Sequence, residues 1–505
     1  MNKFKVRVLC AAFAAGLLGS LAATPALAAE KSSRVIVKFK AGAFAKGKAE
    51  VAASGGKVLL NLSEFNALSV RLSPAALKRL QASRLVEFIE PDYPQYPMAE
   101  AVPYGITMVQ ADQVSDAAAG DRTLCIVDSG IDGTHPDHAG NKLNGENLTA
   151  SGTWDSDESG HGTHVAGTVA AVGGNGIGVV GVMPNKAINL YIAKVFDASG
   201  STSSSTVAKA MWACYKNGGA NVISMSLGGG SPSKLQGIVA KLLDKRGVMM
   251  FAAAGNGGSS AISYPAGFAE VISVAAVDAN KAHASFSQFN ADVEIAAPGV
   301  GVVSTVPVGT GETSTLDVAG TGFEVIAGSG SATGTVSGAL YDFGLGESVD
   351  AGAAGKVCLI SRGNINFSVK VDNCVASGGI GAVVYNNVPG ALGMDLGGAK
   401  TIPAVGADGN DAAALLARVG QTATVAVEIS DYAAFNGTSM ATPHASAVAA
   451  LVWSQHPSCT AAQLRASLNN SAEDLGAAGR DDEFGFGLIR AKAASDRIAT
   501  MGCGN

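Results

Sequence analysis

Several kinds of residue and motif are scarce or absent in this chain of 505 residues. Only 15% of the side chains are charged and 6% are aromatic, while 47% are hydrophobic, and the 65 glycines are scattered instead of gathered in one low-complexity tract. This composition is typical of folded domains and excludes general disorder. No Gly-x-Ser-x-Gly sequence occurs, which argues against an esterase of the α/β-hydrolase type.

Positive charge is scarce outside the first hundred residues. Of 35 basic and 41 acidic side chains, 14 basic and 7 acidic ones lie in residues 1–100, which leaves 21 basic and 34 acidic ones, a net charge of −13, for residues 101–505. A body this acidic argues against nucleic-acid binding, and the basic leader is suited to dock on it by charge. The length exceeds the roughly 250–300 residues that one core supports, so at least two folded units are expected.

The start of the chain has the pattern of an export signal. Lys3, Lys5 and Arg7 precede an apolar stretch, 8–23, and small residues at 26–28 form a cleavage pattern without a stop-transfer sequence. A membrane anchor is the alternative, which the cleavage pattern disfavours. We therefore expect residues 1–28 to be a signal peptide and the mature protein to be secreted. Six cysteines then remain, an even number that suits disulfides in an oxidising compartment, with fifteen possible pairings.

The hydrophobic pattern divides the rest of the chain into four parts. Residues 29–100 have the β-α-β-β-α-β pattern of a small α+β, ferredoxin-like sandwich. In 101–308, short apolar strands alternate with helices, which predicts an α/β fold with a parallel sheet covered on both faces. Residues 309–430 are rich in glycine, alanine and valine and have few helix signals, so they are expected to form a mostly β insertion. Helices resume in 431–505, where the α/β unit is completed.

Three polar residues stand out at the ends of predicted elements. Asp128 ends a buried strand, where an aspartate more often caps or turns the chain than catalyses. His161 begins a helix of small residues, and a metal site shared with His164 is disfavoured because no His-Glu-x-x-His pattern or third ligand is present. Ser439 begins a long apolar helix, where it suits either an N-cap or a nucleophile. Core packing is the favoured role for His164.

Together these residues supply a carboxylate, an imidazole and a hydroxyl in the chain order Asp, His, Ser. A serine nucleophile needs a histidine to take its proton, and the histidine needs a carboxylate to fix its tautomer. Through these three segments, residues 101–307 and 431–500 resemble the subtilisin-like serine proteases. The resemblance implies a doubly wound parallel sheet and a catalytic triad of Asp128, His161 and Ser439. It further implies that Asn256, in the segment 252–256, supplies an oxyanion-hole donor.

The resemblance also implies where substrate lies. The substrate-binding residues expected from the family are Ser226, Leu227, Gly228, Ala253 and Gly255. The segment 226–228 corresponds to an edge to which an extended peptide pairs as an added strand. Neither this segment, nor 253–255, nor Ser263 brings an acidic side chain to the specificity pocket. A broad or apolar preference at the residue before the cleaved bond is therefore expected.

A calcium site, the prosegment and the insertion complete the expectations from the resemblance. Oxygen donors at four positions match the family's tight calcium site, namely Asp137, Asn175, Ile177 and Val179, and the N-terminal ligand position holds Glu100.

Residues 29–100 resemble the inhibitory propeptide, with cleavage expected near 98–100. Within 309–430, the segment 355–374 resembles a protease-associated domain, which is thought to gate or bind substrate, although a tolerated surface insertion is an equal alternative.

The disulfide pairing also comes from the resemblance. The protease-associated pattern implies a bridge between Cys358 and Cys374. Cys459 and Cys503 flank the terminal segment and are expected to pair, which leaves Cys125 with Cys214.

The sequence therefore predicts a secreted serine endopeptidase that cleaves polypeptides through an acyl-enzyme. We expect it to be made as a self-processed zymogen whose own propeptide is inhibitor and folding aid, and to act as a monomer with structural calcium and no organic cofactor. Two alternatives remain, a catalytically silent protein-binding relative and an esterase that uses the same triad.

Overall fold

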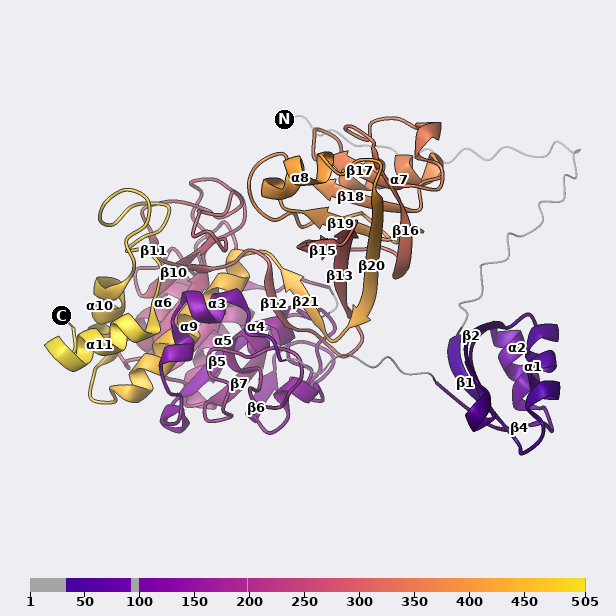
Figure 1. Ribbon diagram of the computed structural model, residues 1–505. Helices are drawn as coiled ribbons and strands as arrows, with labels where there is room; N and C mark the ends of the chain where they lie inside the picture. Colours follow the sequence, from indigo (N-terminus) through magenta and orange to yellow (C-terminus); the bar gives the residue numbers. More distant parts are fainter. Residues whose placement is uncertain (1–32, 92–99, 198, 505) are drawn as a thin grey trace, which may run out of the picture. The chain divides into compact units, whose positions relative to one another are not determined.

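The computed structural model of the protein describes residues 33–91, 100–197 and 199–504, which belong to two compact units, Met1–Pro97 and Met98–Asn505 (Figure 1). The expected signal peptide, 1–28, and residues 92–99, which contain most of the expected cleavage region, lie outside the described residues. No helix of the described ranges is both long and apolar enough to cross a membrane.

The first unit is a four-stranded antiparallel sheet with two helices. Its elements are β1 (Ser33–Phe39), α1 (Phe44–Ala53), β2 (Lys57–Leu62), β3 (Ala67–Leu72), α2 (Pro74–Gln81) and β4 (Val86–Pro91), with strand order β2-β3-β1-β4. Alternate residues of β1, such as Val35 and Val37, are buried in the core beside Leu80 of α2. Ser73 caps α2 by accepting a hydrogen bond from the Ala76 N–H. The predicted β-α-β-β-α-β order is confirmed.

The second unit is built on a seven-stranded parallel sheet with the order β11-β10-β9-β8-β5-β7-β6. The strands are β5 (Thr123–Asp128), β6 (Lys142–Asn147), β7 (Asn189–Lys194), β8 (Val222–Met225), β9 (Met249–Ala253), β10 (Val271–Val277) and β11 (Val293–Pro298). The helices packed around it are α3 (Tyr104–Met108), α4 (His161–Ala170), α5 (Ser204–Lys216), α6 (Lys234–Asp244) and α9 (Thr438–Gln455).

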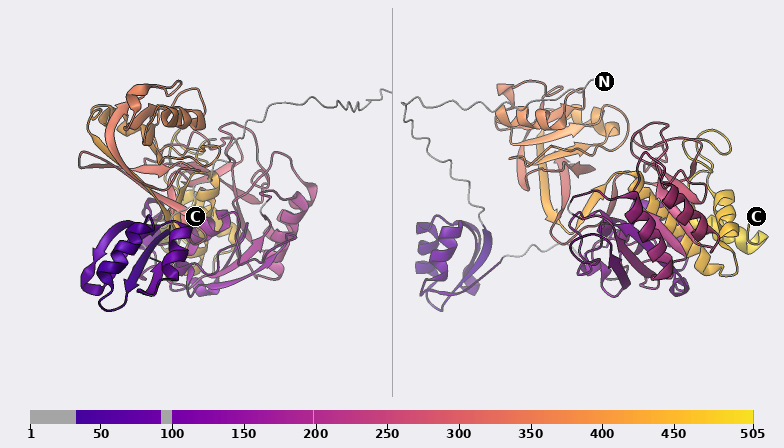
Figure 2. Two further views of the ribbon diagram at one scale, coloured as in Figure 1. Left: turned by 90° about the vertical axis from the view of Figure 1, so that its right-hand side faces the viewer. Right: turned by 180° about the vertical axis from the view of Figure 1, so that it is seen from behind.

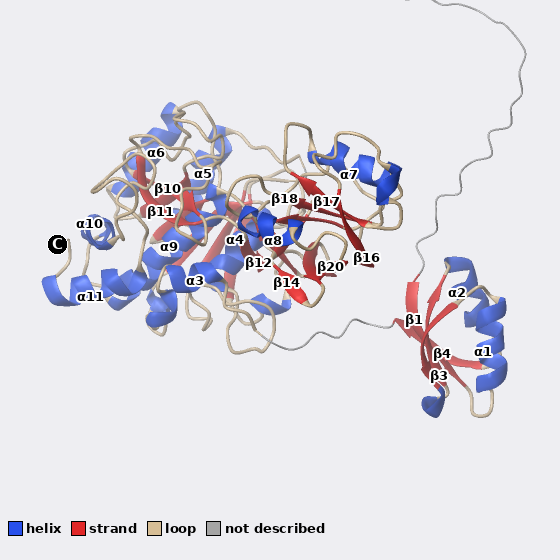
Figure 3. Ribbon diagram, turned by 45° about the horizontal axis from the view of Figure 1, so that its top comes forward, coloured by secondary structure: helices blue, strands red, loops and turns tan. Residues whose placement is uncertain are grey.

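Six of the seven strands are buried on both faces, which explains their apolar sequences, whereas β6, at one edge of the sheet, is partly exposed and largely polar. In β5, Leu124 and Ile126 belong to the core shared with α4 and α9, whereas Cys125 and Val127 belong to the core shared with α5 and α6. Figure 3 shows helices on both sides of the strands. The predicted doubly wound α/β fold is therefore confirmed, with functional residues expected at the carboxyl ends of strands.

The insertion leaves and re-enters the α/β unit through one pair of antiparallel strands, β12 (Val302–Thr305) and β21 (Tyr432–Phe435). Its own eight-stranded mixed sheet has the order β14-β13-β20-β16-β17-β18-β19-β15. The elements are β13 (Gly311–Val318), β14 (Thr321–Phe323), β15 (Val325–Ala327), β16 (Gly334–Asp342), β17 (Val357–Ser361), α7 (Phe367–Ala376), β18 (Gly381–Tyr385), β19 (Ala404–Ala407), α8 (Ala412–Leu416) and β20 (Thr422–Ser430). All views of Figures 1 and 2 show this sheet as a separate lobe of the second unit.

Two further helices follow α9 at the C-terminal end of the described chain. The first, α10 (Ala461–Ser471), was predicted, and begins with a capping box between Thr460 and Gln463. The second, α11 (Ala491–Met501), was not predicted. It packs against α9 and α10, and burial of Ala494 and Ile498 stabilises it.

Three disulfides join elements that are distant in sequence. They link Cys125 of β5 to Cys214 of α5, Cys358 of β17 to Cys374 of α7, and Cys459 to Cys503. The structure thus brings together the same three pairs that the resemblance implied.

Candidate active site

Asp128 and His161 form a hydrogen-bonded pair at the carboxyl end of the parallel sheet. Asp128 is the last residue of β5 and is fully buried, and His161 is the first residue of α4. Asp128 Oδ1 lies 2.7 Å from His161 Nδ1 and also accepts a hydrogen bond of 2.8 Å from the Ser129 N–H. The hydrogen bond from Ser129 fixes the orientation of the Asp128 carboxylate, which keeps it in place to accept from His161.

The pair sets the charge state of the histidine. Burial lowers the pKa of His161, but the attraction and hydrogen bond of Asp128, with a smaller attraction from Asp157, outweigh burial and raise the pKa above its ordinary value. A hydrogen bond from Nδ1–H to Asp128 leaves Nε2 free to accept a proton. The side chain is 31% exposed, so this edge of the ring is accessible.

Lys194 connects the two loops that carry this pair. Its side chain is fully buried at the end of β7, and its ammonium donates to the carbonyls of Ser129 (2.6 Å) and Ser156 (2.9 Å) and to Glu158 (2.5 Å). Ser129 follows Asp128, and Glu158 precedes His161 by three residues. The sequence analysis did not single out Lys194, because nothing in the sequence distinguishes it from a lysine at a solvated strand end.

Ser439 is the second residue of α9 and is not its N-cap, which is Gly437. Its hydroxyl donates to the Ser226 carbonyl at 3.1 Å, and the Ser226 hydroxyl donates to the Ser439 carbonyl at 2.7 Å. Pro443 lies inside this helix and not in its first turn. Proline has no N–H for the carbonyl four residues earlier, which is that of Ser439, and Ser226 satisfies this carbonyl instead.

Asn256 lies beside Ser439 with its amide oxygen already engaged. That oxygen accepts hydrogen bonds from the Thr438 N–H (2.9 Å) and the Thr438 hydroxyl (2.8 Å). Thr438 is fully buried, and its hydroxyl also accepts from the Gly255 N–H at 3.2 Å. These contacts leave the Asn256 amide N–H groups as the donors available on the Ser439 side.

His161, Asn256 and Ser439 line one cleft of about 860 Å³. Residues of the insertion line the same cleft, in β13, β15 and the loop 393–395, as do residues of β21. The structure therefore brings the four expected catalytic residues to one place, because Asp128 lies directly behind His161. The sequence analysis left open whether the insertion gates or binds substrate, and it named no residue of the insertion at this cleft.

The expected substrate-binding residues gather at the ends of β8 and β9. The segment 226–228 follows β8, and the next residue, Gly229, exchanges two backbone hydrogen bonds with Tyr264, of 2.9 and 2.8 Å. A Cβ atom at Gly228 would collide with the Ser263 hydroxyl, and one at Gly255 would collide with Gln288. Ala253 ends β9 and is buried. Small residues are thus required where these chain segments meet, and Leu227 packs partly buried against the α5–α6 core.

His164 lies in the core, as favoured from the sequence. It is fully buried, its Nε2 lies 2.9 Å from the Val302 carbonyl and 3.1 Å from that of Ala433, and its ring stacks on Phe435. Burial lowers the pKa of His164 to about 3, so it stays neutral. It therefore ties α4 to both strands of the β12–β21 pair instead of binding a metal with His161.

The expected calcium ligands lie together, although no group of three or more His, Cys, Asp or Glu suited to a metal occurs among the described residues. Asp137 is fully buried and accepts hydrogen bonds from the Asn175 amide (2.7 Å) and the Val179 N–H (3.0 Å). The Asn175 amide oxygen accepts from the Ile177 N–H at 3.0 Å. Burial raises the pKa of Asp137 despite these bonds.

Glu100 supplies a second observation at this place. Its Oε1 atom is buried without a hydrogen-bond partner in the described chain. The next residue, Ala101, donates through its N–H to the Gly178 carbonyl at 2.8 Å, which brings the start of this unit beside the Asp137 loop. An oxygen-only donor set with a buried carboxylate and an unpaired carboxylate oxygen fits the preference of Ca²⁺.

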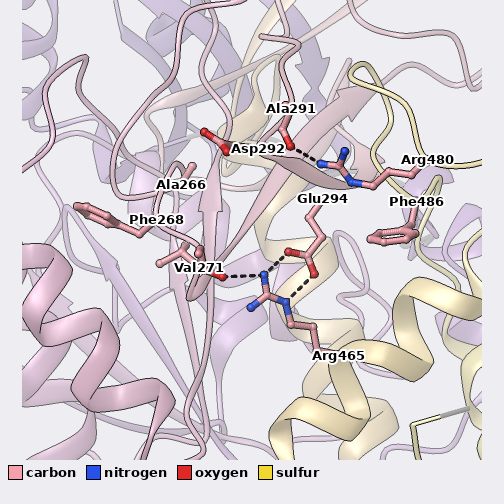
Figure 4. A pocket seen from close by; sticks show the side chains of 10 residues that line it. Ala266, Phe268, Val271, Ala291, Asp292, Glu294, Arg465, Arg480 and Phe486 are labelled. Carbon is pink, nitrogen blue, oxygen red and sulfur yellow. Dashed lines mark hydrogen bonds and ion pairs between the residues drawn. The ribbon is translucent and has the colours of Figure 1, made fainter.

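A second hollow, of about 320 Å³, lies between β11 and α10 and contains none of the expected site residues (Figure 4). Arg465 forms a two-pronged ion pair with Glu294, and Arg480 donates to the Val293 carbonyl at 2.8 Å. Asn469 also donates to Glu294. We interpret the polar groups of this hollow as structural, because the Arg465–Glu294 ion pair joins α10 to β11.

Comparison with known proteins gives the class to which this fold and site belong. Residues 120–341 and 391–487 match the subtilase family, and residues 324–415 match the PA domain. The first match spans more than half of the chain. The chain therefore belongs to the subtilase family of serine endopeptidases and carries a PA domain within its catalytic unit.

Individual relatives agree with this assignment. The chain is 42% identical over 246 residues to an alkaline protease of Alkalihalobacillus alcalophilus, covering 48% of this chain and 63% of the relative, which is less than two thirds. It is 39% identical over 300 residues to subtilisin amylosacchariticus of Bacillus subtilis subsp. amylosacchariticus, covering 56% and 77%. The crystal structure of a psychrophilic subtilisin-like protease from the Antarctic psychrotroph Pseudoalteromonas sp. AS-11 is similar, with a TM-score of 0.69 at 40% identity, covering 80% of this chain and 99% of that one.

Proposed function

We propose that this protein is a secreted serine endopeptidase in which Asp128, His161 and Ser439 form the catalytic triad. The observation that carries the proposal is the 2.7 Å contact between Asp128 and His161, in a cleft that His161 shares with Ser439 and Asn256. A buried carboxylate behind an accessible histidine, with a hydroxyl at the same cleft, is the arrangement that acyl transfer requires.

In the proposed reaction, the Ser439 hydroxyl oxygen attacks the peptide carbonyl while its proton passes to Nε2 of His161. The C–N bond then breaks, and the imidazolium gives the proton to the leaving amine, so that an acyl-enzyme remains. Water, deprotonated by His161, attacks the ester and releases the acid and Ser439. Asp128 keeps Nδ1–H in place throughout and stabilises the positive ring.

Asn256 is proposed to stabilise the negative oxygen of the tetrahedral intermediates. Its amide oxygen is held by Thr438, so its N–H groups are fixed before substrate arrives. The Ser439 N–H, near the start of α9, is the second proposed donor. Donors that are already positioned need no reorganisation during the reaction, and loss of one such donor lowers kcat by ~10²- to 10³-fold in serine proteases.

The proposed substrate preference at the residue before the cleaved bond is broad or apolar. The residues placed there, 226–228, 253–255 and Ser263, include no acidic side chain that would select a basic one. Hydrolysis of a peptide panel that varies only at this position tests the proposal. Cleavage restricted to Lys or Arg there would contradict it.

Export and delayed activation complete the proposed function. Residues 1–28 are the proposed signal peptide, 29–100 the inhibitory propeptide, 101–308 and 431–505 the catalytic domain, and 309–430 the inserted domain. The net charges of +7 for residues 1–100 and −13 for the remainder support electrostatic docking of the propeptide before its removal.

We further propose a structural calcium ion held by Asp137, Asn175 and the carbonyls of Ile177 and Val179, with Glu100 as a further donor only in the precursor, because residue 100 ends the proposed propeptide. Such an ion would supply a dipositive charge that compensates the buried Asp137 carboxylate. The test compares Tm with Ca²⁺ and with a chelator, where wild type is expected to be protected by Ca²⁺ and Asp137→Ala is not. Equal Tm values for wild type under both conditions would contradict the proposal.

The decisive test of the catalytic proposal is expression of the precursor with and without Ser439→Ala. We expect the variant to keep its propeptide and to leave casein intact, while the matched control Ser205→Ala, an exposed serine on α5, matures and digests casein normally. Equal processing and digestion by Ser439→Ala would refute the assignment.

A further inference from the structure

The insertion forms one wall of the cleft that contains His161 and Ser439. Strands β13 and β15 and the loop 393–395 line it, and β13 continues from the β12–β21 pair that joins the insertion to the catalytic unit (Figure 1). A substrate that occupies the whole cleft therefore touches the insertion as well as the catalytic residues. Specificity is thus decided in part by what the insertion presents there.

Glu312 is the charged residue that β13 presents to this wall. Alternate residues of a strand lie on the same face, so Glu312 shares a face with Ser314 and Leu316. The Ser314 hydroxyl donates to the Val325 carbonyl of β15 at 3.0 Å, and Leu316 enters the core of the insertion. This face therefore points toward β15, and at Glu312, where the core ends, it opens into the cleft.

The Glu312 carboxylate has no counter-ion. In the described part of the chain no hydrogen bond or ion pair reaches it, and burial without any compensating contact raises its pKa. The cleft lining contains one further carboxylate, that of Asp395, and no lysine or arginine. A half-buried carboxylate in an acidic body gains most from a cationic ligand, which restores the interactions that burial removed.

The surroundings of Glu312 also suit the stem of a long basic side chain. The apolar residues Val306, Val325, Ile326 and Met394 line the same cleft. Lysine and arginine side chains lie with their methylene groups along apolar surface while the charged end reaches a polar partner. A free metal ion is disfavoured as the ligand, because no group of three or more His, Cys, Asp or Glu side chains suited to a metal occurs among the described residues.

The position of the cleft indicates which half of the substrate it holds. The residues proposed to bind the acyl half, 226–228 and 253–255, do not line it, whereas His161, Asn256, Ser439 and Met440 do. The cleft thus extends from Ser439 away from the acyl-side strand. A peptide chain that continues past the cleaved bond enters it with its leaving-group half.

We propose that Glu312 forms a subsite of the inserted domain that selects a lysine or arginine side chain on the leaving-group side of the cleaved bond. This inference rests on the proposed peptidase function and adds a preference distinct from the apolar one on the acyl side. It assigns the insertion, through β13 at the edge of the PA-domain match, a direct part in substrate selection.

The test uses the mature enzyme obtained from the full chain and internally quenched peptides with one fixed acyl half. Lys, Arg, Gln or Glu is placed in turn at the second, third or fourth residue after the cleaved bond. At one of these positions wild type is expected to show a kcat/KM about five- to ten-fold higher for Lys or Arg than for Gln, and lowest for Glu. Added salt is expected to lower the ratio of kcat/KM for the Lys or Arg peptide to that for the Gln peptide, because salt screens the attraction between charges.

Glu312→Gln is expected to bring the Lys/Gln ratio to about one, and Glu312→Lys to favour Glu. The matched control is Glu428→Gln, an exposed carboxylate on the neighbouring strand β20 that does not line the cleft, and it is expected to keep the wild-type ratio. Because each ratio is taken within one enzyme, a general loss of activity does not affect it. An unchanged ratio in Glu312→Gln, or no preference in wild type, would overturn the subsite, whereas cleavage by Ser439→Ala would overturn the peptidase function itself.

Discussion

The catalytic unit and the insertion both line one cleft, but they differ in whether their polar side chains at the cleft have hydrogen-bond partners within the protein. On the catalytic side, two of the proposed catalytic groups are held by buried partners, since Asp128 holds His161 and Thr438 holds Asn256. On the insertion side, Glu312 has no partner in the described chain. Chemistry requires groups that are fixed before substrate arrives, whereas a recognition group is satisfied by the substrate itself.

The largest expected difference between the two sides comes from removing one carboxylate charge. Asp128→Asn is expected to lower kcat by ~10⁴-fold with little change in KM, because the amide favours the wrong tautomer of His161. The matched variant in the insertion, Asp317→Asn on β13, is exposed and expected to stay within two-fold of wild type. Steady-state kinetics on one peptide measures both, and a comparable loss in both variants would remove the distinction.

The disulfides are expected to differ in what they contribute to stability. The Cys125–Cys214 bridge closes a loop with a sequence separation of 89, and Cys358–Cys374 one of 16. Loop entropy gives contributions to the free energy of unfolding of about 4.5 and about 3 kcal/mol, respectively. Denaturant unfolding of the two paired Cys→Ser variants checks the order, and a larger loss for the insertion would contradict it.

Each region also has one fully buried lysine, and these are expected to matter unequally for catalysis. Lys194→Met leaves the Ser129 and Ser156 carbonyls without their donor and is expected to lower kcat by ~10- to 100-fold. Lys370→Met is the control, since that lysine donates to the Leu345 carbonyl within the insertion. It is expected to lower Tm while leaving kcat unchanged. Equal kcat values for the two variants would show that Lys194 does not position the triad.

The smallest expected effect is on the pH dependence. His161 acts as a base only when neutral, so its raised pKa places the acidic limb of kcat/KM above the ordinary histidine value of ~6.5, with activity rising as pH increases. The Asp157 carboxylate attracts the protonated ring and so raises the pKa of His161. Asp157→Asn removes this attraction and is expected to move the acidic limb of the kcat/KM profile to lower pH by a few tenths of a unit. Glu428→Gln is expected to leave it in place. A shift of the limb to higher pH in Asp157→Asn would contradict the assignment.

Most of the parallel sheet was predictable because strands such as β5, β7 and β8 are short apolar runs in a series that alternates with helices. The edge strand β6 was missed, because its sequence is polar and its place depends on pairing with β7. The residues of the proposed triad were found for a related reason, since each lies in a distinctive segment at the end of such an element. The helix α11 was missed, because its sequence follows a turn-rich stretch and much of its stabilisation comes from packing against elements distant in sequence, among them α9 and the turn Ala111–Gln113.

The features missed at the site depend on contacts between distant residues. Proline inside a helix normally leaves one carbonyl without a donor, yet at Pro443 the Ser226 hydroxyl replaces the N–H that the proline lacks. Glu312 resembles any acidic residue of a surface strand, and only the approach of β15 and the loop 393–395 encloses it. Sequence patterns report local structure, and they carry little information on which polar groups remain unpaired after folding.

The paired strands β12 and β21 also bear on how such a protein changes over evolutionary time. Thr305 and Tyr432 are direct partners in this two-stranded sheet, so the chain leaves for the insertion and returns at the same point. A single excision or exchange between these positions would reconnect the catalytic chain across one strand pair without rerouting any other element. The insertion is in this sense a replaceable module. Replacing the residues with which it lines the cleft offers a way to change the substrate preference while the catalytic residues remain unchanged.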